Sequence, residues 1–152
     1  MKRIFTMFAL TFAAWLLVAC DTLPETHMTE VVMYKSPSCD CCSGWAEHLR
    51  REGFSVTEKK RDDMDVIKAA NGVTDKLASC HTAIVDGYVI EGHVPASDIR
   101  RLLQEKPANV VGLTAPGMPM KSPGMQPAGL PPRAYDVFAF DKKGNVKVFS
   151  KY

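Results

Sequence analysis

Apolar and polar positions follow a regular order along the chain from residue 30 onward. The run EVVMYK at 30–35 predicts a buried strand, which Ser36-Pro37-Ser38 ends. The spacing of apolar residues from about Cys42 predicts a helix that stops at Gly53. FSVTEKK then alternates as a second strand, and DDMDVIKAAN predicts a short helix. The first part of the pattern is therefore strand, helix, strand, helix.

A hairpin and a third helix come next. Residues 82–85 and 88–91 flank Asp86-Gly87, which is a strong signal for a hairpin turn. PASDIRRLLQEK at 95–106 places its aliphatic residues on one helical face. The order β-α-β-α-β-β-α predicts an α/β fold, specifically a thioredoxin-like domain.

The C-terminal part has a different composition. Residues 114–132, TAPGMPMKSPGMQPAGLPP, hold six of the ten prolines and three of the eight methionines, with no helical or strand period, so they predict a loop. AYDVFAF and VKVFS follow around a Lys-Lys-Gly-Asn turn and predict a closing β-hairpin. We expect one domain over residues 30–152, with a Pro/Gly/Met-rich loop and this hairpin at its end.

The N-terminal residues predict export. Residues 1–19 combine two basic residues with an apolar stretch too short for a spanning helix, as in a signal peptide. Residues 17–20, LVAC, resemble the bacterial lipobox, which predicts a lipoprotein whose lipidated first residue is Cys20. An ordinary signal peptide cut nearby is the alternative. With residues 21–29 as a polar tether, we expect a periplasmic lipoprotein anchored in a membrane.

The charge balance disfavours nucleic acid as a partner. The chain has 19 basic and 17 acidic residues, and loss of Lys2 and Arg3 with the signal peptide leaves 17 of each. The exported chain is then formally neutral and has no long basic run. Proteins that bind nucleic acid normally carry a basic patch or stripe.

Four cysteines remain after Cys20, three of them in SPSCDCCSGW. Two structural disulfides are the simplest interpretation for an exported chain, but a Cys41–Cys42 bond would be strained and a Cys39–Cys41 bond would close a very small ring. The cluster is expected where the first strand meets the first helix. A helix N-terminus favours negative charge, so these thiols are shifted toward thiolate, the form that attacks disulfides and binds metals.

A fourth thiol is expected to face the cluster. Cys39 and Cys42 have the Cys-x-x-Cys spacing of redox dithiols and are candidate redox thiols, whereas Cys41 has no role in simple dithiol exchange. Cys80 and His81 directly precede the predicted third strand, where a thioredoxin-like fold brings its loop against the dithiol. The sequence therefore predicts a pocket of soft ligands built from two distant segments.

Methionines in the loop favour copper over zinc. Thioethers discriminate for Cu(I) among biological metals, and Met118, Met120 and Met125 lie on a segment that its prolines stiffen. A cap that packs on the core is the alternative.

The four histidines differ in their expected roles. His81, beside Cys80, is the best candidate ligand, with a hydrogen-bonded strand-edge residue as the alternative. His93 follows the predicted hairpin and has a weaker claim to the site. His48 is expected on the helix surface, and His27 is expected to be solvated in the tether.

Four separated motifs resemble domain-of-unknown-function family 411, a predicted metal-binding family with periplasmic members in copper resistance. They are YKSPSCDCCSGWAEHL, SCHTAIVDGYVIEGHVPASDI, VGLTAPGMP with SPGM, and YDVFAFDKKG, and they cover about residues 30–150. The resemblance implies a thioredoxin-like fold adapted to copper clusters and a role as a Cu(I)/Cu(II) oxidoreductase. By position, the family's cysteines fall on Cys39, Cys41, Cys42 and Cys80, and its glycine-proline-methionine motif on Met118 and Met125. Met120 lies outside that pattern.

Three functions follow from these observations. The first is a copper-binding redox protein of copper resistance, whose copper ligands are Cys39, Cys41, Cys42, Cys80, His81, Met118 and Met125. The second is a thiol–disulfide oxidoreductase, and the third is a copper chaperone or storage module without turnover. The expected partners are copper ions, a membrane through the lipid at Cys20, and other periplasmic copper-resistance proteins.

Overall fold

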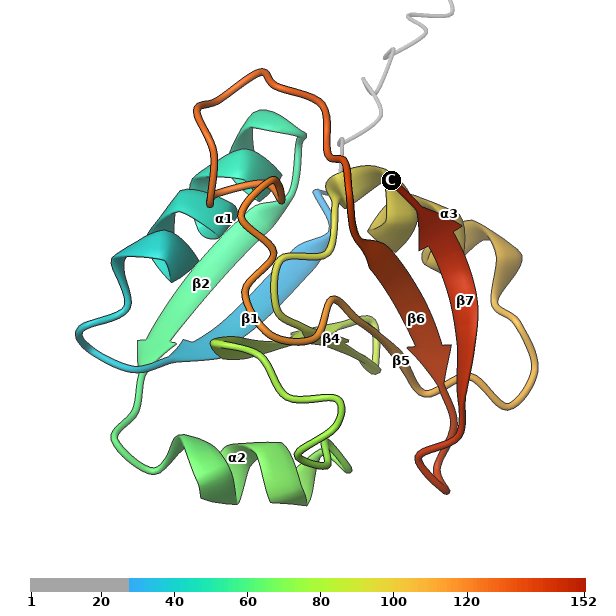
Figure 1. Cartoon of the computed structure of the whole chain (residues 1–152). Helices are drawn as coiled ribbons and strands as arrows, with labels where there is room; N and C mark the ends of the chain where they lie inside the picture. The colour runs from blue at the N-terminus through green and yellow to red at the C-terminus, as the bar shows by residue number, and fades with distance from the viewer. Residues whose placement is uncertain (1–27) are drawn as a thin grey trace, which may run out of the picture.

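A computed structural model of the chain describes residues 28–152 as seven strands and three helices (Figure 1). The strands are β1 (Glu30–Lys35), β2 (Ser55–Lys60), β3 (His81–Val85), β4 (Tyr88–Glu91), β5 (Gly112–Thr114), β6 (Asp136–Phe140) and β7 (Val146–Lys151). The helices are α1 (Asp40–Arg51), α2 (Met64–Ala70) and α3 (Ala96–Glu105). The predicted signal peptide, Cys20, His27 and most of the tether lie outside the described residues. No helix within residues 28–152 has the length and apolar character needed to cross a bilayer.

All seven strands form one sheet in the order β2-β1-β3-β4-β5-β6-β7. The pairs β1/β2 and β4/β5 are parallel, and the other four pairs are antiparallel. The prediction of an α/β fold is confirmed, and the strands and helices up to α3 occur in the predicted order. β5 was not predicted as an element, because three buried residues are too few to show a period.

The helices cover both faces of the sheet, with α1 and α3 on one face and α2 on the other (Figure 1). The main core lies under α1 and α3, where Trp45 and Leu49 pack with Ile99 and Leu102 against strand residues such as Met33. A smaller apolar cluster on the other face consists of Val73, Leu77, Val89 and Phe140. The side chain of each strand residue therefore projects either toward α1 or toward α2. Only those that project toward α1 lie on the face of the sheet that carries the cysteines.

The register between β1 and β3 places two polar residues on the α1 face. Lys35 pairs with His81, and Met33 pairs with Ala83. Residues opposite one another in a sheet project to the same face, so Lys35 and His81 lie on the face of the buried Met33 side chain. Thr82 pairs with Glu91 and projects to the α2 face.

The segment between β5 and β6 crosses from the sheet to α1 and returns (Figure 1). At its closest point two glycines meet, and a Cβ atom on Gly44 would lie 2.9 Å from the carbonyl oxygen of Gly124. Gly124 has φ +85°, and a Cβ atom there would lie 2.8 Å from the carbonyl carbon of Gly44. The loop can dock on α1 only because neither position carries a side chain.

Candidate metal centre

Three cysteines occupy the first turn of α1 and the residue before it. The helix begins at Asp40, two positions earlier than expected, so Cys39 is its N-cap residue and has extended backbone angles. The Cys39 amide donates to the Ser36 carbonyl at 3.1 Å and closes the turn after β1. The Cys39 and Cys41 sulfurs are then 3.5 Å apart.

Cys39 and Cys42 form a disulfide, whereas Cys41 and Cys80 are free thiols. The Cα atoms of the bonded pair are 5.5 Å apart, within the usual range for a disulfide. A framework of two structural disulfides is therefore not formed by the described cysteines. The bonded pair is the Cys-x-x-Cys pair that the spacing singled out.

Cys80 reaches the same place from the segment that enters β3. The sulfurs of Cys39, Cys41, Cys42 and Cys80 all lie within 4.8 Å of one another. The structure thus brings the four predicted cysteines together from two segments that are distant in sequence. A group of thiols this close can bridge soft metal ions once it is reduced.

Two imidazoles border the Cys80 sulfur. The Cys80 sulfur is 3.3 Å from His81 Nδ1 and 3.1 Å from His93 Nε2. The predicted ligand His81 is thus in the pocket, together with His93, which the sequence ranked lower. The turn after β4 places His93 there. Gly92 has φ +72°, and its amide donates to the His81 carbonyl, which brings His93 back beside β3.

A backbone carbonyl orients the His93 ring. Nδ1 of His93 lies 2.6 Å from the carbonyl oxygen of Pro123, so Nδ1 carries the proton and donates it. The lone pair of Nε2 is then directed at the Cys80 sulfur. Metal-binding histidines commonly donate their second nitrogen in this way.

Burial decides the protonation states of these groups. It lowers the pKa of His81 well below the usual value, with help from the neighbouring His93. Burial also lowers the pKa of His93 and raises the pKa of Cys80 to about 12. Both imidazoles are therefore neutral near pH 7 and able to ligate, while Cys80 must lose a proton when a metal binds.

A buried lysine supports the α1 side of the pocket. Lys35 is 3% exposed, and its ammonium donates to the Cys39 carbonyl at 3.0 Å and to the Ser43 hydroxyl. Glu58 balances this charge at 3.4 Å. The sequence did not single out Lys35, because a lysine that ends a strand normally reaches solvent.

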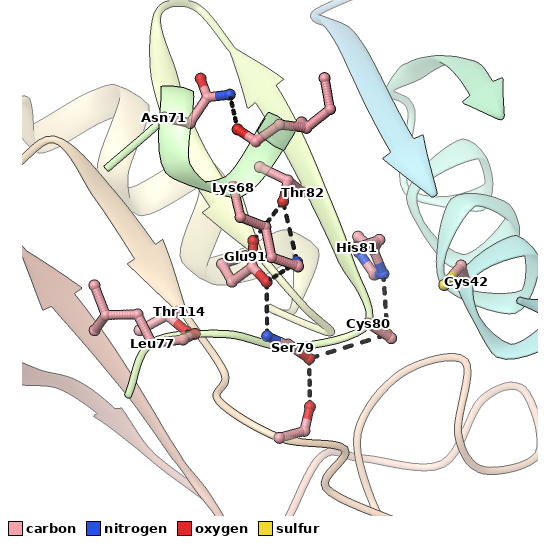
Figure 2. Close-up of polar contacts among 12 residues, drawn as sticks. Cys42, Lys68, Asn71, Leu77, Ser79, Cys80, His81, Thr82, Glu91 and Thr114 are labelled. Atoms are coloured by element: carbon pink, nitrogen blue, oxygen red, sulfur yellow. Dashed lines mark hydrogen bonds and ion pairs between the residues drawn. The ribbon is translucent and has the colours of Figure 1, made fainter. Parts of the chain in front are cut away.

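A buried glutamate supports the Cys80 side (Figure 2). The Glu91 carboxylate accepts from the Ser79 amide at 2.6 Å and from the Thr82 hydroxyl at 2.7 Å, and it forms an ion pair with Lys68 of α2. Because Ser79 directly precedes Cys80, this carboxylate fixes the segment that carries the fourth thiol.

Comparison with known proteins identifies the family of the chain. The family model described as "Protein of unknown function, DUF411" matches residues 77–125. Two solved structures, "Copper resistance protein copG" forms 1 and 2, are 38% identical to the chain, cover 82% of it and 98% of their own length, and have TM-scores of 0.75 and 0.74. The chain belongs to the DUF411 family. No curated protein matches it.

The loop of this DUF411 protein holds its methionines in different environments. Met118 and Met120 are 60% and 69% exposed, whereas Met125 is partly buried directly after the docked Gly124. Coordination through Met118 and Met125 stays a prediction. The loop supplies the Pro123 carbonyl to the pocket. The amino-acid composition of the loop did not indicate this contact.

His48 of the DUF411 chain differs from the expectation of a surface residue. It is partly buried, and its Nε2 accepts the Ala96 amide at 3.2 Å. The side chain therefore joins α1 to the first residue of α3, outside the metal pocket. Hydrogen bonding to an unpaired helix-end amide explains its burial.

Proposed function

We propose that this DUF411 protein is an exported copper-binding protein of copper resistance. The observation that carries the proposal is the convergence of four cysteine sulfurs within 4.8 Å, with two neutral imidazoles beside them. Clustered thiolates suit Cu(I) better than the harder divalent ions. Similarity to structures named copper resistance protein copG supports the same metal.

The proposal includes redox handling of copper on a thioredoxin-like framework. In support, β1 to β4 lie in the sheet order β2-β1-β3-β4, with α1 directly after β1. The Cys39–Cys42 pair is at that junction and is oxidised. Reduction of one disulfide takes two electrons, which is what two Cu(I) ions release when they become Cu(II). Periplasmic location and a lipid anchor at Cys20 belong to the proposal and rest on residues 1–20.

We expect the reduced protein to bind more than one Cu(I) ion. Four thiolates around a single ion would leave excess negative charge, whereas bridging thiolates share that charge among several ions. An anaerobic Cu(I) titration against a chromophoric chelator measures the stoichiometry. The disulfide form, which has lost two thiols, is the control and should bind fewer ions. One Cu(I) or fewer per reduced protein would contradict a cluster.

Thiol–disulfide exchange is the second candidate, because the Cys39–Cys42 disulfide is the form that such an enzyme would show. The same preparation separates the two functions. A copper protein should bind Cu(I) tightly and fail to reduce insulin disulfides, whereas an oxidoreductase should do the reverse. Tight binding with no change in copper oxidation state would favour a chaperone or storage role.

The double substitution Met118→Leu and Met125→Leu tests the loop thioethers. Leucine keeps the apolar volume, so the loss of stability should stay under about 1.5 kcal/mol per site. We expect unchanged Zn(II) binding but weaker Cu(I) affinity or a shifted copper potential, because a thioether favours Cu(I). Met120→Leu, also exposed, is the control and should leave copper binding unchanged. Lower stability with unchanged copper properties would make the loop a packing cap.

A further inference from the structure

Two overlapping sets of metal ligands meet at Cys80. One set consists of the four cysteine sulfurs, and the other of Cys80, His81 and His93. In the disulfide form the first set loses Cys39 and Cys42, since a disulfide sulfur has no thiolate to offer. The second set keeps all three of its ligands. The two sets cannot be filled independently, because they share the Cys80 sulfur.

The spacing of the second set is close to that of a tetrahedral site. A tetrahedral ion with one sulfur and two nitrogen ligands holds sulfur and nitrogen roughly 3.5 Å apart, given metal–ligand distances of about 2.3 and 2.0 Å. The observed separations from the Cys80 sulfur are 3.3 Å to His81 and 3.1 Å to His93. Both separations are within a few tenths of an ångström of the tetrahedral spacing.

Two features of the imidazoles point to a ligand. The Pro123 carbonyl fixes the His93 ring with its Nε2 lone pair toward Cys80. The His81 ring is fully buried, its Nδ1 faces Cys80, and its Nε2 has no hydrogen-bond partner within residues 28–152. An unsatisfied buried polar group costs free energy. A metal ion on Nδ1 would not pair Nε2; the ring nitrogens that face the Cys80 sulfur, His81 Nδ1 and His93 Nε2, are the ones able to ligate.

We infer that in the disulfide form Cys80, His81 and His93 bind one borderline divalent cation, of which Zn(II) is the reference ion. Imidazole with a single thiolate suits such ions, whereas the reduced four-thiol set suits Cu(I). The state of the Cys39–Cys42 pair thus selects between two metals at one pocket. The binding of Cu(I) by the reduced protein rests on the proposed function, whereas the binding of a divalent cation by the disulfide form rests on this geometry alone.

Cobalt titration of the full-length protein tests the site. Co(II) replaces Zn(II) in such sites, and a tetrahedral cobalt–thiolate site shows visible d–d bands and a near-ultraviolet charge-transfer band. With the Cys39–Cys42 disulfide verified by mass after alkylation, we expect one Co(II) per protein, displaced by one Zn(II). His93→Gln should weaken binding by more than about 100-fold, since even residues that only orient a ligand account for 10- to 100-fold. His48→Gln, which lies outside the pocket, should bind like the parent.

Several results would overturn the inference. These are no Co(II) binding by the oxidised protein, or binding lost in Cys41→Ser but kept in His93→Gln. X-ray absorption of the Zn(II)-loaded parent needs no variant: one sulfur and two nitrogen ligands are expected, and two or more sulfurs would contradict the site. If the oxidised protein does not bind Co(II) while the reduced protein binds Cu(I), the proposed function stands. If the oxidised protein binds Co(II) while the reduced protein does not bind Cu(I), the proposed function alone is contradicted.

Discussion

Cys80→Ser is expected to abolish most tight Cu(I) binding while the protein still folds. Cys80 is the residue that both ligand sets share. Because changes to residues that merely orient a ligand cost 10- to 100-fold, removing this shared ligand should weaken Cu(I) binding by more than about 100-fold. Competition with a chromophoric chelator measures the affinity. Circular dichroism checks the fold, whose core comes from the buried residues of the sheet, α1 and α3.

Cys41→Ser is the matched comparison for this variant. Cys41 is also a partly buried free thiol, but it belongs to the four-sulfur set alone. We expect Cys41→Ser to lower Cu(I) affinity less and to leave the Cys80, His81 and His93 set intact. Parent-like Cu(I) affinity in Cys80→Ser would mean that the segment entering β3 takes no part in the site.

Gly124→Ala is expected to undock the loop from α1. A Cβ atom there would lie 2.8 Å from the carbonyl carbon of Gly44, and the backbone has φ +85°. Relief of the clash would move the neighbouring Pro123 carbonyl away from His93. We therefore expect lower stability in thermal or denaturant unfolding, together with weaker metal binding by the Cys80, His81 and His93 set.

Gly129→Ala is the control, since Gly129 lies in the same loop with the same φ of +85° but has open space where its Cβ atom would be. Both variants carry the cost of a left-handed alanine, roughly 1–2 kcal/mol. Overpacking adds about 1–3 kcal/mol to Gly124→Ala alone. Equal stabilities for the two variants would show that the contact with α1 does not hold the loop.

Periodicity predicted the fold well where an element buries one regular face. The pattern of 30–35 and the helical spacing of Trp45 and Leu49 survive in β1 and α1, because alternation and the 3.6-residue repeat follow from burial against a single layer. β5 escaped prediction because its three residues are too few to show a period.

The thiols of the candidate site could be predicted from the sequence, but the groups that hold the site residues in place could not. Clustered cysteines stand out by type and spacing, and topology brings Cys80 to them. Lys35, Glu91 and the Pro123 carbonyl act through tertiary contacts to Cys39, Ser79 and His93. A backbone carbonyl leaves no trace in the sequence, and the burial of a charged strand residue depends on a partner that only the fold supplies.

The pairing of Lys35 with His81 ties the metal pocket to the backbone ladder of the sheet. One strand ends at the turn that carries Cys39, and the other begins immediately after Cys80. The gap between the two halves of the pocket is therefore set by strand spacing, and a slip of one residue would turn His81 to the α2 face. The long stretch of chain between the halves, which includes β2 and α2, contributes none of the ligands in either set. Metal uptake thus reports whether β1 and β3 have paired in register, so a metal-binding signal can time the formation of the central strand pair during folding.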